Sequence, residues 1–464
     1  MPLEQAALAA GARILNPAPV NITGAASDNR KVLPGQMFVA VAGERADGHE
    51  FSAAAVKAGA VAILAEHDPF GGEPLAPVLL VRNSVEALGR IGHAWRAAFR
   101  GRVVGITGTA GKTTTKELLA HILSMRGKTA RSLMNLNTQI GMPISMMAAD
   151  GDEAFWVMEA GISHPGDMDE LGPIMEPDLA VVLNVGAGHS LGLGEKGTAY
   201  YKARLFRHLR KGGIALASAD YEDLAHEVLA IRPDAVFFST GARPAPYRAA
   251  YLGIDNNGRG NYRLWFTASS LDVNCALSGP YAAENIIAAA AAAHLLGLSR
   301  EEIRTGVETA LLPAQRFARH ELPGWTVIDD TYNANPLSAG RMLEAASELA
   351  GNCDFVCVMG EMGELGDIAP AEHRELGRRI SASGCTAVFW TGGYASEVKE
   401  GLELGQYHGF FAVLSGPDDF LPALESWESA RKNSRKGLVL FKGSRANHME
   451  RLVNLFMKRN GHAL

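Results

Sequence analysis

Beyond Arg102 the hydrophobic residues fall into short continuous runs, and each run predicts a buried β-strand. The runs are RVVGIT (102–107), AFWVME (154–159), LAVVLN (179–184), TVIDD (326–330), DFVCVMG (354–360), AVFWTG (387–392) and GLVLF (437–441). Most of them lead through Gly, Asn or Asp into a segment whose apolar residues have helical spacing. Strands that are apolar on both faces and alternate with helices are typical of a parallel sheet between helical layers. The pattern therefore predicts an α/β fold.

The chain of 464 residues is long enough for about three domains of roughly 150 residues each. Residues 1–82 contain a small α/β unit with its own turn residues. The helical segment NSVEALGRIGHAWRAAF (83–99) then leads into the next strand. An alanine-rich helix and LSREEIRTGVETALL (298–312) precede a second change near Pro313. We expect domains at 1–82, 83–313 and 314–464.

Composition and charge restrict the class of protein. Hydrophobic residues at 47% and charged residues at 20% exclude a disordered or fibrous chain. A net charge of −6 argues against a general nucleic-acid or anionic-membrane surface. The longest apolar stretch, Ile286–Leu298, is too short to span a bilayer, and the first residues lack the basic flank of a signal peptide. The scattered cysteines do not form a disulfide framework, and we expect Cys353 and Cys357 to pack in one core strand. These features predict a cytoplasmic protein.

The strongest local signal is TGTAGKTT (Thr107–Thr114), between an apolar strand and the helical KELLAHIL (116–123). Glycines at 108 and 111 let the backbone N–H groups curl around phosphate oxygens, and the helix N-terminus favours an anion. Lys112 can reach the β- and γ-phosphates, and the Thr113 hydroxyl suits Mg²⁺. Ile106 stands where the longer phosphate-loop consensus has glycine, so only the shorter form G-x-x-G-K-T is present. The alternative is a glycine- and threonine-rich turn that binds nothing.

Polar residues follow several of the predicted strands, where ligands of doubly wound sheets gather. They are Glu159, Asn184 with His189 in the next loop, Asp329, Asp330 and Lys442. Each residue alone would more often be a capping or surface residue. Their shared placement predicts convergence on the crevice that contains Lys112. Glu159 is a natural oxygen ligand for Mg²⁺, and His189 is less typical of that cation.

Several segments together resemble the Mur-type ATP-dependent amide ligases of peptidoglycan synthesis. The segments are TGTAGKTT (107–114), MNLNTQIGMP (134–143), VMEAGISHPGDMDEL (157–171) and VVLNVGAGHSLGLG (181–194). SDNRKVLPGQMFVAVAGERADGHEF (27–51) resembles the N-terminal domain shared by the third and fourth amino-acid-adding ligases. DDTYNANPLS (329–338), MGEMGELG (359–366) and KGSRANHME (442–450) are similar to the D-alanyl-D-alanine-adding branch.

The resemblance implies a three-domain ligase. It implies a first domain that binds a uridine nucleotide, a central phosphate-loop ATPase-type domain, and a C-terminal Rossmann-like domain that binds a dipeptide. It further implies that UDP-N-acetylmuramoyl-tripeptide and D-Ala-D-Ala are joined through an acyl phosphate, with ATP and one or two Mg²⁺ ions. The implied protein is a monomer with no nucleic-acid partner and no membrane insertion.

Motif matching carries the family's site residues onto this chain. The implied Mg²⁺ ligands are Thr113, Glu159, His189 and a carbamylated Lys202, which join Lys112 and Arg316 in the catalytic set. ATP would contact Thr107, Gly108, Thr109, Ala110, Gly111, Lys112, Thr113 and Thr114, with Asn285 at adenine, Arg316 at the γ-phosphate and Asp330 at the ribose. The implied substrate residues are Asp28, Asn29, Arg30, Asp47, Gly48, His49, Asn137, Thr138, Tyr332, Asn333, Asn335, Lys442, Ser444 and Arg445. Without carbamylation, Lys202 would be a surface helix charge.

The chain departs from the family pattern at several positions. Tyr281 and Ala282 stand where relatives carry His and Asn, Arg204 replaces an acidic residue, and Asn29 replaces Ser or Thr. The glycine expected before Arg316 is also absent. Two alternatives therefore stay open. One is a related ligase for another amino acid or dipeptide, including a polyglutamylating ligase. The other is a catalytically silent scaffold that binds the nucleotide sugar.

Overall fold

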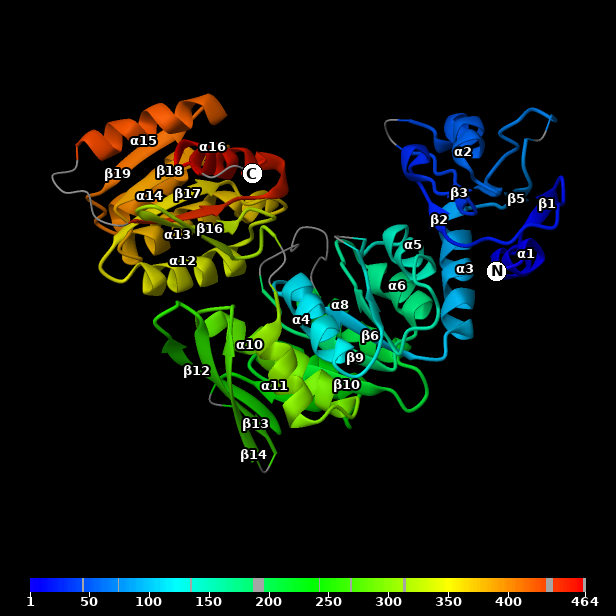
Figure 1. The fold of residues 1–464 in the computed structure, drawn as a ribbon, viewed down its shortest axis with the longest axis horizontal. Helices are drawn as coiled ribbons and strands as arrows, with labels where there is room; N and C mark the ends of the chain where they lie inside the picture. The colour runs from blue at the N-terminus through cyan, green and yellow to red at the C-terminus, as the bar shows by residue number, and fades with distance from the viewer. Residues whose placement is uncertain are drawn as a thin grey trace.

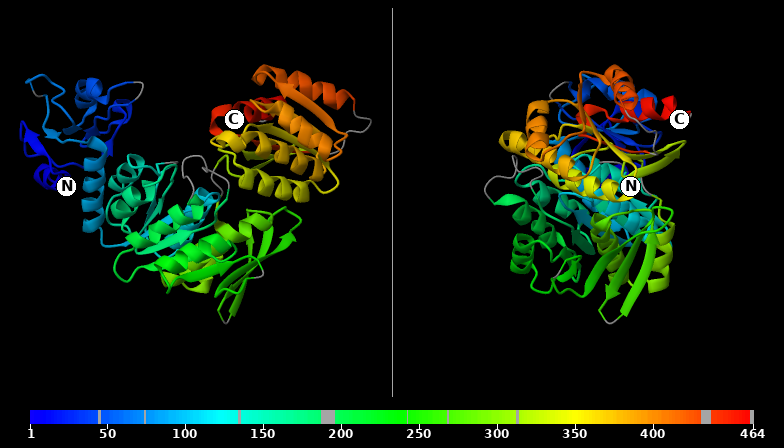
Figure 2. Two further views of the ribbon diagram at one scale, coloured as in Figure 1. Left: turned by 180° about the vertical axis from the view of Figure 1, so that it is seen from behind. Right: turned by 90° about the vertical axis from the view of Figure 1, so that its left-hand side faces the viewer.

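The computed structural model describes residues 1–43, 46–73, 75–133, 136–186, 196–241, 243–267, 269–311, 314–430 and 437–461. The chain forms three lobes arranged as a V, with the middle lobe at its base (Figures 1 and 2). Among the described residues the long ladders form three sheets, one in each lobe. Each sheet falls within one of the three predicted domains, whose boundaries at 82 and 313 stay a prediction. We call the lobes the first, middle and C-terminal domains.

The first domain holds a five-stranded sheet in the order β1-β5-β4-β3-β2, which is parallel except for β1. Its strands are β1 (Arg13–Leu15), β2 (Ala25–Ala26), β3 (Met37–Val39), β4 (Ala62–Ala65) and β5 (Val78–Leu80), with helices α1 (Leu3–Ala10) and α2 (Ser52–Ala58). Helix α3 (Ser84–Ala98) begins where the Asn83 side chain accepts a hydrogen bond from the Glu86 N–H. At its other end, the buried Arg96 guanidinium donates to Asp178 at 2.8 Å. This ion pair attaches α3 to the middle domain.

The middle domain holds a nine-stranded sheet in the order β14-β13-β12-β11-β10-β9-β6-β8-β7, parallel from β7 to β12. Its parallel strands are β6 (Arg102–Thr107), β7 (Thr129–Arg131), β8 (Phe155–Glu159), β9 (Leu179–Val182), β10 (Ile214–Ser218), β11 (Val236–Ser239) and β12 (Tyr247–Ile254). Its helices are α4 (Lys112–Ser124), α5 (Gly141–Met147), α6 (Asp167–Met175), α8 (Gly197–Ala203), α9 (Glu222–Ile231), α10 (Pro280–Leu295) and α11 (Arg300–Thr309). The alanine-rich α10 is buried nearly all round between α4 and the sheet, because methyl side chains allow close packing.

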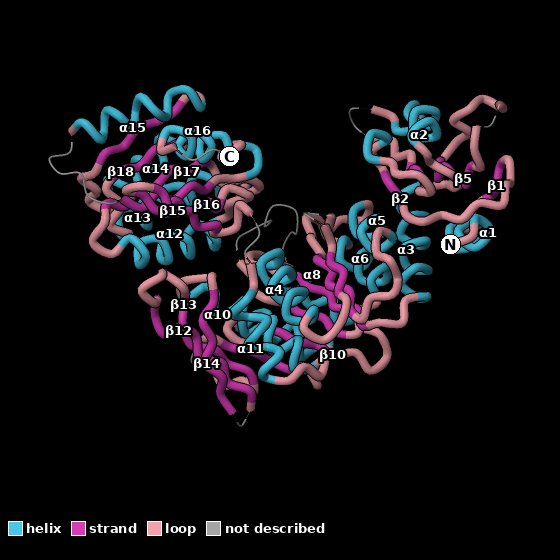
Figure 3. Tube along the Cα trace, in the orientation of Figure 1, coloured by secondary structure: helices cyan, strands magenta, loops and turns pink. Residues whose placement is uncertain are grey.

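An antiparallel extension of the middle sheet was not predicted. β13 (Gly260–Phe266) and β14 (Ser269–Cys275) add to β12 as antiparallel strands at the end of the sheet (Figure 3). In β13 buried residues alternate with more exposed ones, which is the pattern of a sheet covered on one face only. The continuous apolar runs used for the prediction do not detect such strands.

The C-terminal domain holds a six-stranded sheet in the order β15-β16-β20-β17-β18-β19, parallel except for β15. Its strands are β15 (Ala318–Leu322), β16 (Trp325–Asp330), β17 (Asp354–Gly360), β18 (Ala387–Thr391), β19 (Phe410–Leu414) and β20 (Gly437–Lys442). Its helices are α12 (Pro336–Ala350), α13 (Ala369–Ala382), α14 (Ala395–Leu404), α15 (Phe420–Ser429) and α16 (Glu450–Arg459). One prediction is wrong here. Cys353 is exposed and precedes β17, whereas Cys357 is buried inside it.

The predicted α/β class is confirmed, and every predicted strand from RVVGIT to GLVLF is present as β6, β8, β9, β16, β17, β18 or β20. Within the ranges described above, no helix is both long enough and apolar enough to cross a membrane. Thr107 and Glu159 end β6 and β8 of the middle domain, and Asp330 ends β16 of the C-terminal domain.

Candidate active site

The segment between β6 and α4 has the backbone of a phosphate-binding loop. Gly111 has φ +79° and directly precedes α4, whose N-terminus begins at Lys112. Lys112 folds back so that its Nζ donates to the Gly108 carbonyl at 2.9 Å. Thr107 donates to the Ala160 carbonyl at 2.9 Å, which joins the loop to the end of β8. The buried Thr109 hydroxyl has no hydrogen-bond partner among the residues that the structure describes, and Thr114 lies half-buried in the first turn of α4.

Replacing Gly111 with alanine should weaken nucleotide binding as well as stability. A Cβ there would lie 2.2 Å from Asn285 Oδ1, and positive φ strains any L-residue by about 1–3 kcal/mol. Gly212→Ala is the matched control, because Gly212 has φ +78° and an added Cβ would meet nothing within 4 Å. We expect urea unfolding to show the strain in both variants and calorimetry to show lost ADP affinity in Gly111→Ala alone. Equal ADP affinity in the two variants would contradict this role of the loop.

Oxygen donors gather beside the loop. Thr113 Oγ1 donates to Glu159 Oε2 at 2.8 Å, and the Asn137 amide donates to Glu159 Oε1 at 2.9 Å. Glu159 is nearly fully buried. Arg316 of the C-terminal domain donates to Thr113 Oγ1 at 3.1 Å. A hydroxyl and a buried carboxylate in contact form a donor set that fits a hard divalent cation.

Lys202 lies on α8, and its side chain is 1% exposed. No hydrogen bond or ion pair joins its Nζ to any residue within the described ranges. Burial lowers the pKa of the Lys202 ammonium well below its usual value, and the charge of Lys112 lowers it further. The alternative of a surface helix charge is therefore wrong. His189, predicted as a neighbouring Mg²⁺ ligand, lies outside the described residues.

The surroundings of Lys112 shift the pKa of its ammonium in opposite directions. Burial lowers the pKa of the Lys112 ammonium, and Arg316 acts in the same direction. The carboxylates of Glu159 and Glu364 raise the same pKa. Glu364, which the sequence analysis did not single out, therefore places a C-terminal-domain charge within electrostatic range of the loop. A bound polyanion would add to the carboxylates and favour the charged ammonium.

Asn285, expected at adenine, and Asp330, expected at the ribose, both make hydrogen bonds with other residues of the protein. Asn285 accepts a hydrogen bond from Thr115 Oγ1 at 3.2 Å and is buried against Gly111. Asp330 accepts from the Phe317 N–H at 3.0 Å and from Lys442 Nζ at 2.5 Å. The ion pair between Asp330 and Lys442 is buried. Contacts of these side chains with a nucleotide or a dipeptide stay predictions.

Residues after β16 join the C-terminal domain to the loop. The Arg316 guanidinium stacks 3.9 Å from the Tyr332 ring centroid. Asn335 caps α12 by accepting from the Ser338 N–H, and its amide donates to the Thr109 carbonyl at 3.4 Å. Asn333 is exposed and accepts from the Ala334 N–H.

The remaining substrate candidates of the middle and C-terminal domains lie near this junction or at the end of β20. The Thr138 hydroxyl accepts from the Gly141 N–H at 3.2 Å, next to Asn137. Ser444 is buried and donates to Asn447, whereas Arg445 is exposed near Glu450. The structure thus brings Arg316, Tyr332 and Asn335 to the loop, and it places Ser444 and Arg445 just past the β20 end that carries Lys442.

The substrate candidates of the first domain form local clusters. Arg30 forms a bidentate ion pair with Asp28, in which Nε donates to Oδ1 at 2.9 Å and Nη2 donates to Oδ2 at 2.8 Å. This pairing lowers the pKa of the Asp28 carboxyl to about 2. Asn29 lies in the same short turn. Gly48 has to be glycine, because a Cβ would lie 2.6 Å from the Val41 nitrogen. Nothing in the first domain contacts the loop by a hydrogen bond among the described residues.

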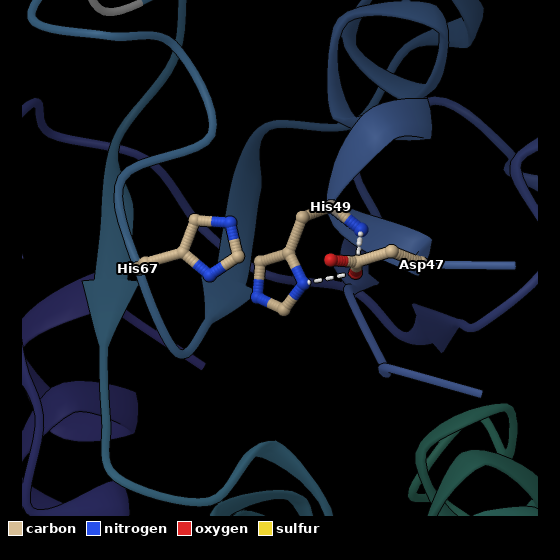
Figure 4. Close-up of side chains that lie close together, drawn as sticks. All are labelled: Asp47, His49 and His67. Carbon is tan, nitrogen blue, oxygen red and sulfur yellow. Dashed lines mark hydrogen bonds and ion pairs between the residues drawn. The ribbon is translucent and has the colours of Figure 1, made fainter. Parts of the chain in front are cut away.

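Asp47, His49 and His67 lie close enough to suggest a metal site, but the hydrogen bonds exclude His49 as a ligand (Figure 4). His49 Nδ1 pairs with Asp47 at 2.6 Å, and Nε2 accepts from the Glu66 N–H at 2.9 Å. Both ring nitrogens are thereby occupied. His67 stacks on His49 with ring centroids 3.9 Å apart. In this arrangement His49 has no ring nitrogen left for a cation.

Sequence reasoning missed a buried polar cluster beneath the phosphate loop. Asn184, noted as a strand-end residue, binds both backbone groups of Ala110. Its partner Glu284 also bonds Tyr221 and Arg341. Glutamate inside the alanine-rich helix was the one available signal, because a charged residue is rarely buried without partners.

Comparisons with known proteins cover nearly the whole chain. The profile of the Mur ligase middle domain matches residues 106–293, the Mur ligase glutamate ligase domain matches 315–445, and the catalytic domain of the Mur ligase family matches 21–96. The chain is 30% identical over 453 residues to the UDP-N-acetylmuramoyl-tripeptide–D-alanyl-D-alanine ligase of Escherichia coli strain K12, and the alignment covers 96% of each chain.

Solved structures give the same result. The chain is similar to MurF from Acinetobacter baumannii, with a TM-score of 0.89, 29% identity and 99% coverage of each chain. It is also similar to MurF ligase from Thermotoga maritima in complex with ADP, with a TM-score of 0.81 and 29% identity, covering 94% of this chain and 97% of that one.

Proposed function

The chain belongs to the Mur ligase family, and on this premise we propose that it joins D-alanyl-D-alanine to UDP-N-acetylmuramoyl-tripeptide at the expense of ATP. The proposal rests on full-length similarity to ligases of that name and on one observation in the site. Arg316 of the C-terminal domain contacts Thr113, which contacts Glu159. Two domains thus supply charge and oxygen ligands to the loop that would bind the triphosphate. The enzyme acts as a monomer.

The donor set fits Mg²⁺, which the family implies. Thr113 and Glu159 would hold it, with His189 as a third candidate. Lys202 would contribute after carbamylation, because an ammonium cannot bind a cation whereas a carbamate offers oxygen. Only the neutral amine reacts with CO₂, and the lowered pKa of Lys202 supplies that form. Bound Mg²⁺ would neutralise charge on the phosphate oxygens.

The residues of this chain support activation of a carboxylate by phosphoryl transfer. The C-terminal carboxylate of the tripeptide attacks the γ-phosphorus of ATP, the bond to the β-phosphate oxygen breaks, and ADP leaves. Two anions approach each other in this step, so positive charge is required. Lys112 and Arg316 supply it from opposite domains. The helix N-terminus at Lys112 adds its partial positive charge to the loop.

The second step forms the peptide bond. The amine of D-alanyl-D-alanine attacks the acyl carbon, a tetrahedral oxyanion forms, and inorganic phosphate leaves with the bonding electrons. The amine loses a proton in the process. Water would hydrolyse the acyl phosphate, so the domains have to exclude it during both steps. The contacts of Arg316 and Asn335 with the loop hold the C-terminal domain where it can do so.

A substrate panel tests this proposal against the two alternatives. Purified enzyme is incubated with ATP, Mg²⁺, UDP-N-acetylmuramoyl-tripeptide and, in separate tubes, D-Ala-D-Ala, L-glutamate, L-lysine or meso-diaminopimelate. We expect mass spectrometry to show the pentapeptide product with D-Ala-D-Ala only. Extension with another amino acid would indicate the related ligase. No product and no ATP turnover in any tube would contradict the proposed ligase.

A further inference from the structure

A buried ion pair connects the C-terminal domain to the floor of the phosphate loop. Arg341 on α12 donates to Glu284 Oε2 on α10 at 2.8 Å, and the two helices are in contact (Figure 1). The Glu284 side chain is 4% exposed and that of Arg341 is 18% exposed. Arg341 also donates to Tyr221 at 2.9 Å, and Tyr221 donates to Glu284 Oε1 at 3.1 Å. Both carboxylate oxygens of Glu284 are therefore held by hydrogen bonds.

The same carboxylate orients a residue that shapes the loop. Asn184 Nδ2 donates to Glu284 Oε2 at 2.7 Å and to the Ala110 carbonyl at 3.0 Å. Asn184 Oδ1 accepts from the Ala110 N–H at 2.8 Å, and its carbonyl accepts from the Thr109 N–H at 3.0 Å. A flipped amide would point Oδ1 at the carboxylate, so Glu284 fixes the orientation that matches Ala110.

The charge of Glu284 makes this arrangement depend on the neighbouring domain. Arg341 is the cation that contacts the Glu284 carboxylate, and it comes from the C-terminal domain. Removing one partner of a buried ion pair leaves an uncompensated charge, which strongly favours rearrangement. Withdrawal of α12 would therefore favour hydration of Glu284 and release of Asn184. Such coupling is reciprocal. If docking of the C-terminal domain favours the loop arrangement that binds nucleotide, bound nucleotide favours docking by the same free energy.

We propose that Glu284 and Arg341 are positioning residues that couple docking of the C-terminal domain to the shape of the phosphate loop, so that nucleotide binds more tightly when Arg341 contacts Glu284. The inference rests on the proposed function only in taking residues 108–113 as the nucleotide site. It assigns a role to two residues that make no contact with the reacting groups.

The test compares ADP affinity in full-length variants by calorimetry. Arg341→Met removes the charge, Arg341→Lys keeps it with one donor group, and Glu284→Gln keeps the shape of the carboxylate. Tyr251→Phe is the matched control, because Tyr251 also makes a hydrogen bond to the C-terminal domain, at 2.7 Å to Glu348, outside the Asn184 network. Amide hydrogen exchange at Ala110 gives a second reading of the loop.

We expect Arg341→Met to weaken ADP binding about tenfold, Arg341→Lys to weaken it less, and Tyr251→Phe to change it by less than about twofold. Exchange at Ala110 should speed up in Arg341→Met and stay unchanged in Tyr251→Phe. The double variant Glu284→Gln/Arg341→Met should bind no worse than its weaker parent. Wild-type affinity and wild-type exchange in Arg341→Met, equal losses in Tyr251→Phe, or multiplied losses in the double variant would overturn the proposal.

Failure of the ligase assignment would be seen separately. ADP binding and Ala110 exchange need no acceptor substrate, so the expected ranking of variants can hold even when no pentapeptide forms. If wild-type protein bound no ADP, the proposed function would fail and Ala110 exchange would still decide the coupling. If Arg341→Met did not fold, Arg341→Lys and Glu284→Gln would carry the same comparison.

Discussion

Replacing Lys112 with alanine is expected to lower ligase turnover about 10²–10³-fold, the usual cost of removing a preorganised electrostatic partner of phosphoryl transfer. Lys112 is the basic residue at the start of α4, and its Nζ already lies over the loop at the Gly108 carbonyl. The measurement is ADP release that requires both the nucleotide tripeptide and D-Ala-D-Ala.

Lys128→Ala is the control for Lys112→Ala. Lys128 belongs to the same domain but is about half exposed and pairs with Asp150 on the surface. Its loss should leave turnover within about twofold of wild type, since surface ion pairs contribute little. Full turnover in Lys112→Ala would show that Lys112 does not stabilise the phosphoryl group during its transfer.

Replacing Lys202 with alanine is expected to lower turnover about 10²-fold or more, because the proposed carbamate ligand of Mg²⁺ would be lost. Lys196→Ala is the control, because Lys196 is exposed and directly precedes the same helix. In NMR with ¹³C-labelled bicarbonate, wild type should show a carbamate signal that Lys202→Ala lacks. Unchanged turnover in Lys202→Ala, or a carbamate signal that persists in it, would contradict the assignment.

The lowered pKa of Lys202 also predicts the direction of a pH effect. Carbamate forms from the neutral amine, so an ordinary lysine would form little of it near neutral pH. A lowered pKa extends the neutral form to lower pH, and carbamylation should be lost only as pH falls through that lowered pKa. Added bicarbonate should restore activity on the acid side of this transition in wild type and not in Lys202→Ala.

The sequence predicted the strands that are covered by helices on both faces. β6, β8 and β17 follow from uninterrupted apolar runs, because such strands need apolar side chains on both faces. β13 and β14 were missed, because strands with one exposed face carry polar residues at alternate positions. The exposed position of Cys353 was missed for a related reason, since one apolar residue beside a run does not fix where the strand begins.

The site was predicted where a short motif fixes the geometry. The segment TGTAGKTT defines a loop whose shape depends on neighbours in sequence, and Gly111 and Lys112 are placed as expected. The contact of Arg316 with Thr113 joins residues that are 203 positions apart, and only the family resemblance suggested it. No sequence motif pointed to Glu284 or Arg341. Their contact depends on how two domains dock, which a local sequence pattern does not encode.

Oxygen-isotope transfer tests the central claim of carboxylate activation by ATP. The carboxylate of the tripeptide is labelled with ¹⁸O, and the inorganic phosphate released during synthesis with ATP and D-Ala-D-Ala is analysed by mass spectrometry. An acyl phosphate predicts that each phosphate carries one labelled oxygen taken from the carboxylate. Pentapeptide formed together with unlabelled phosphate would contradict the account.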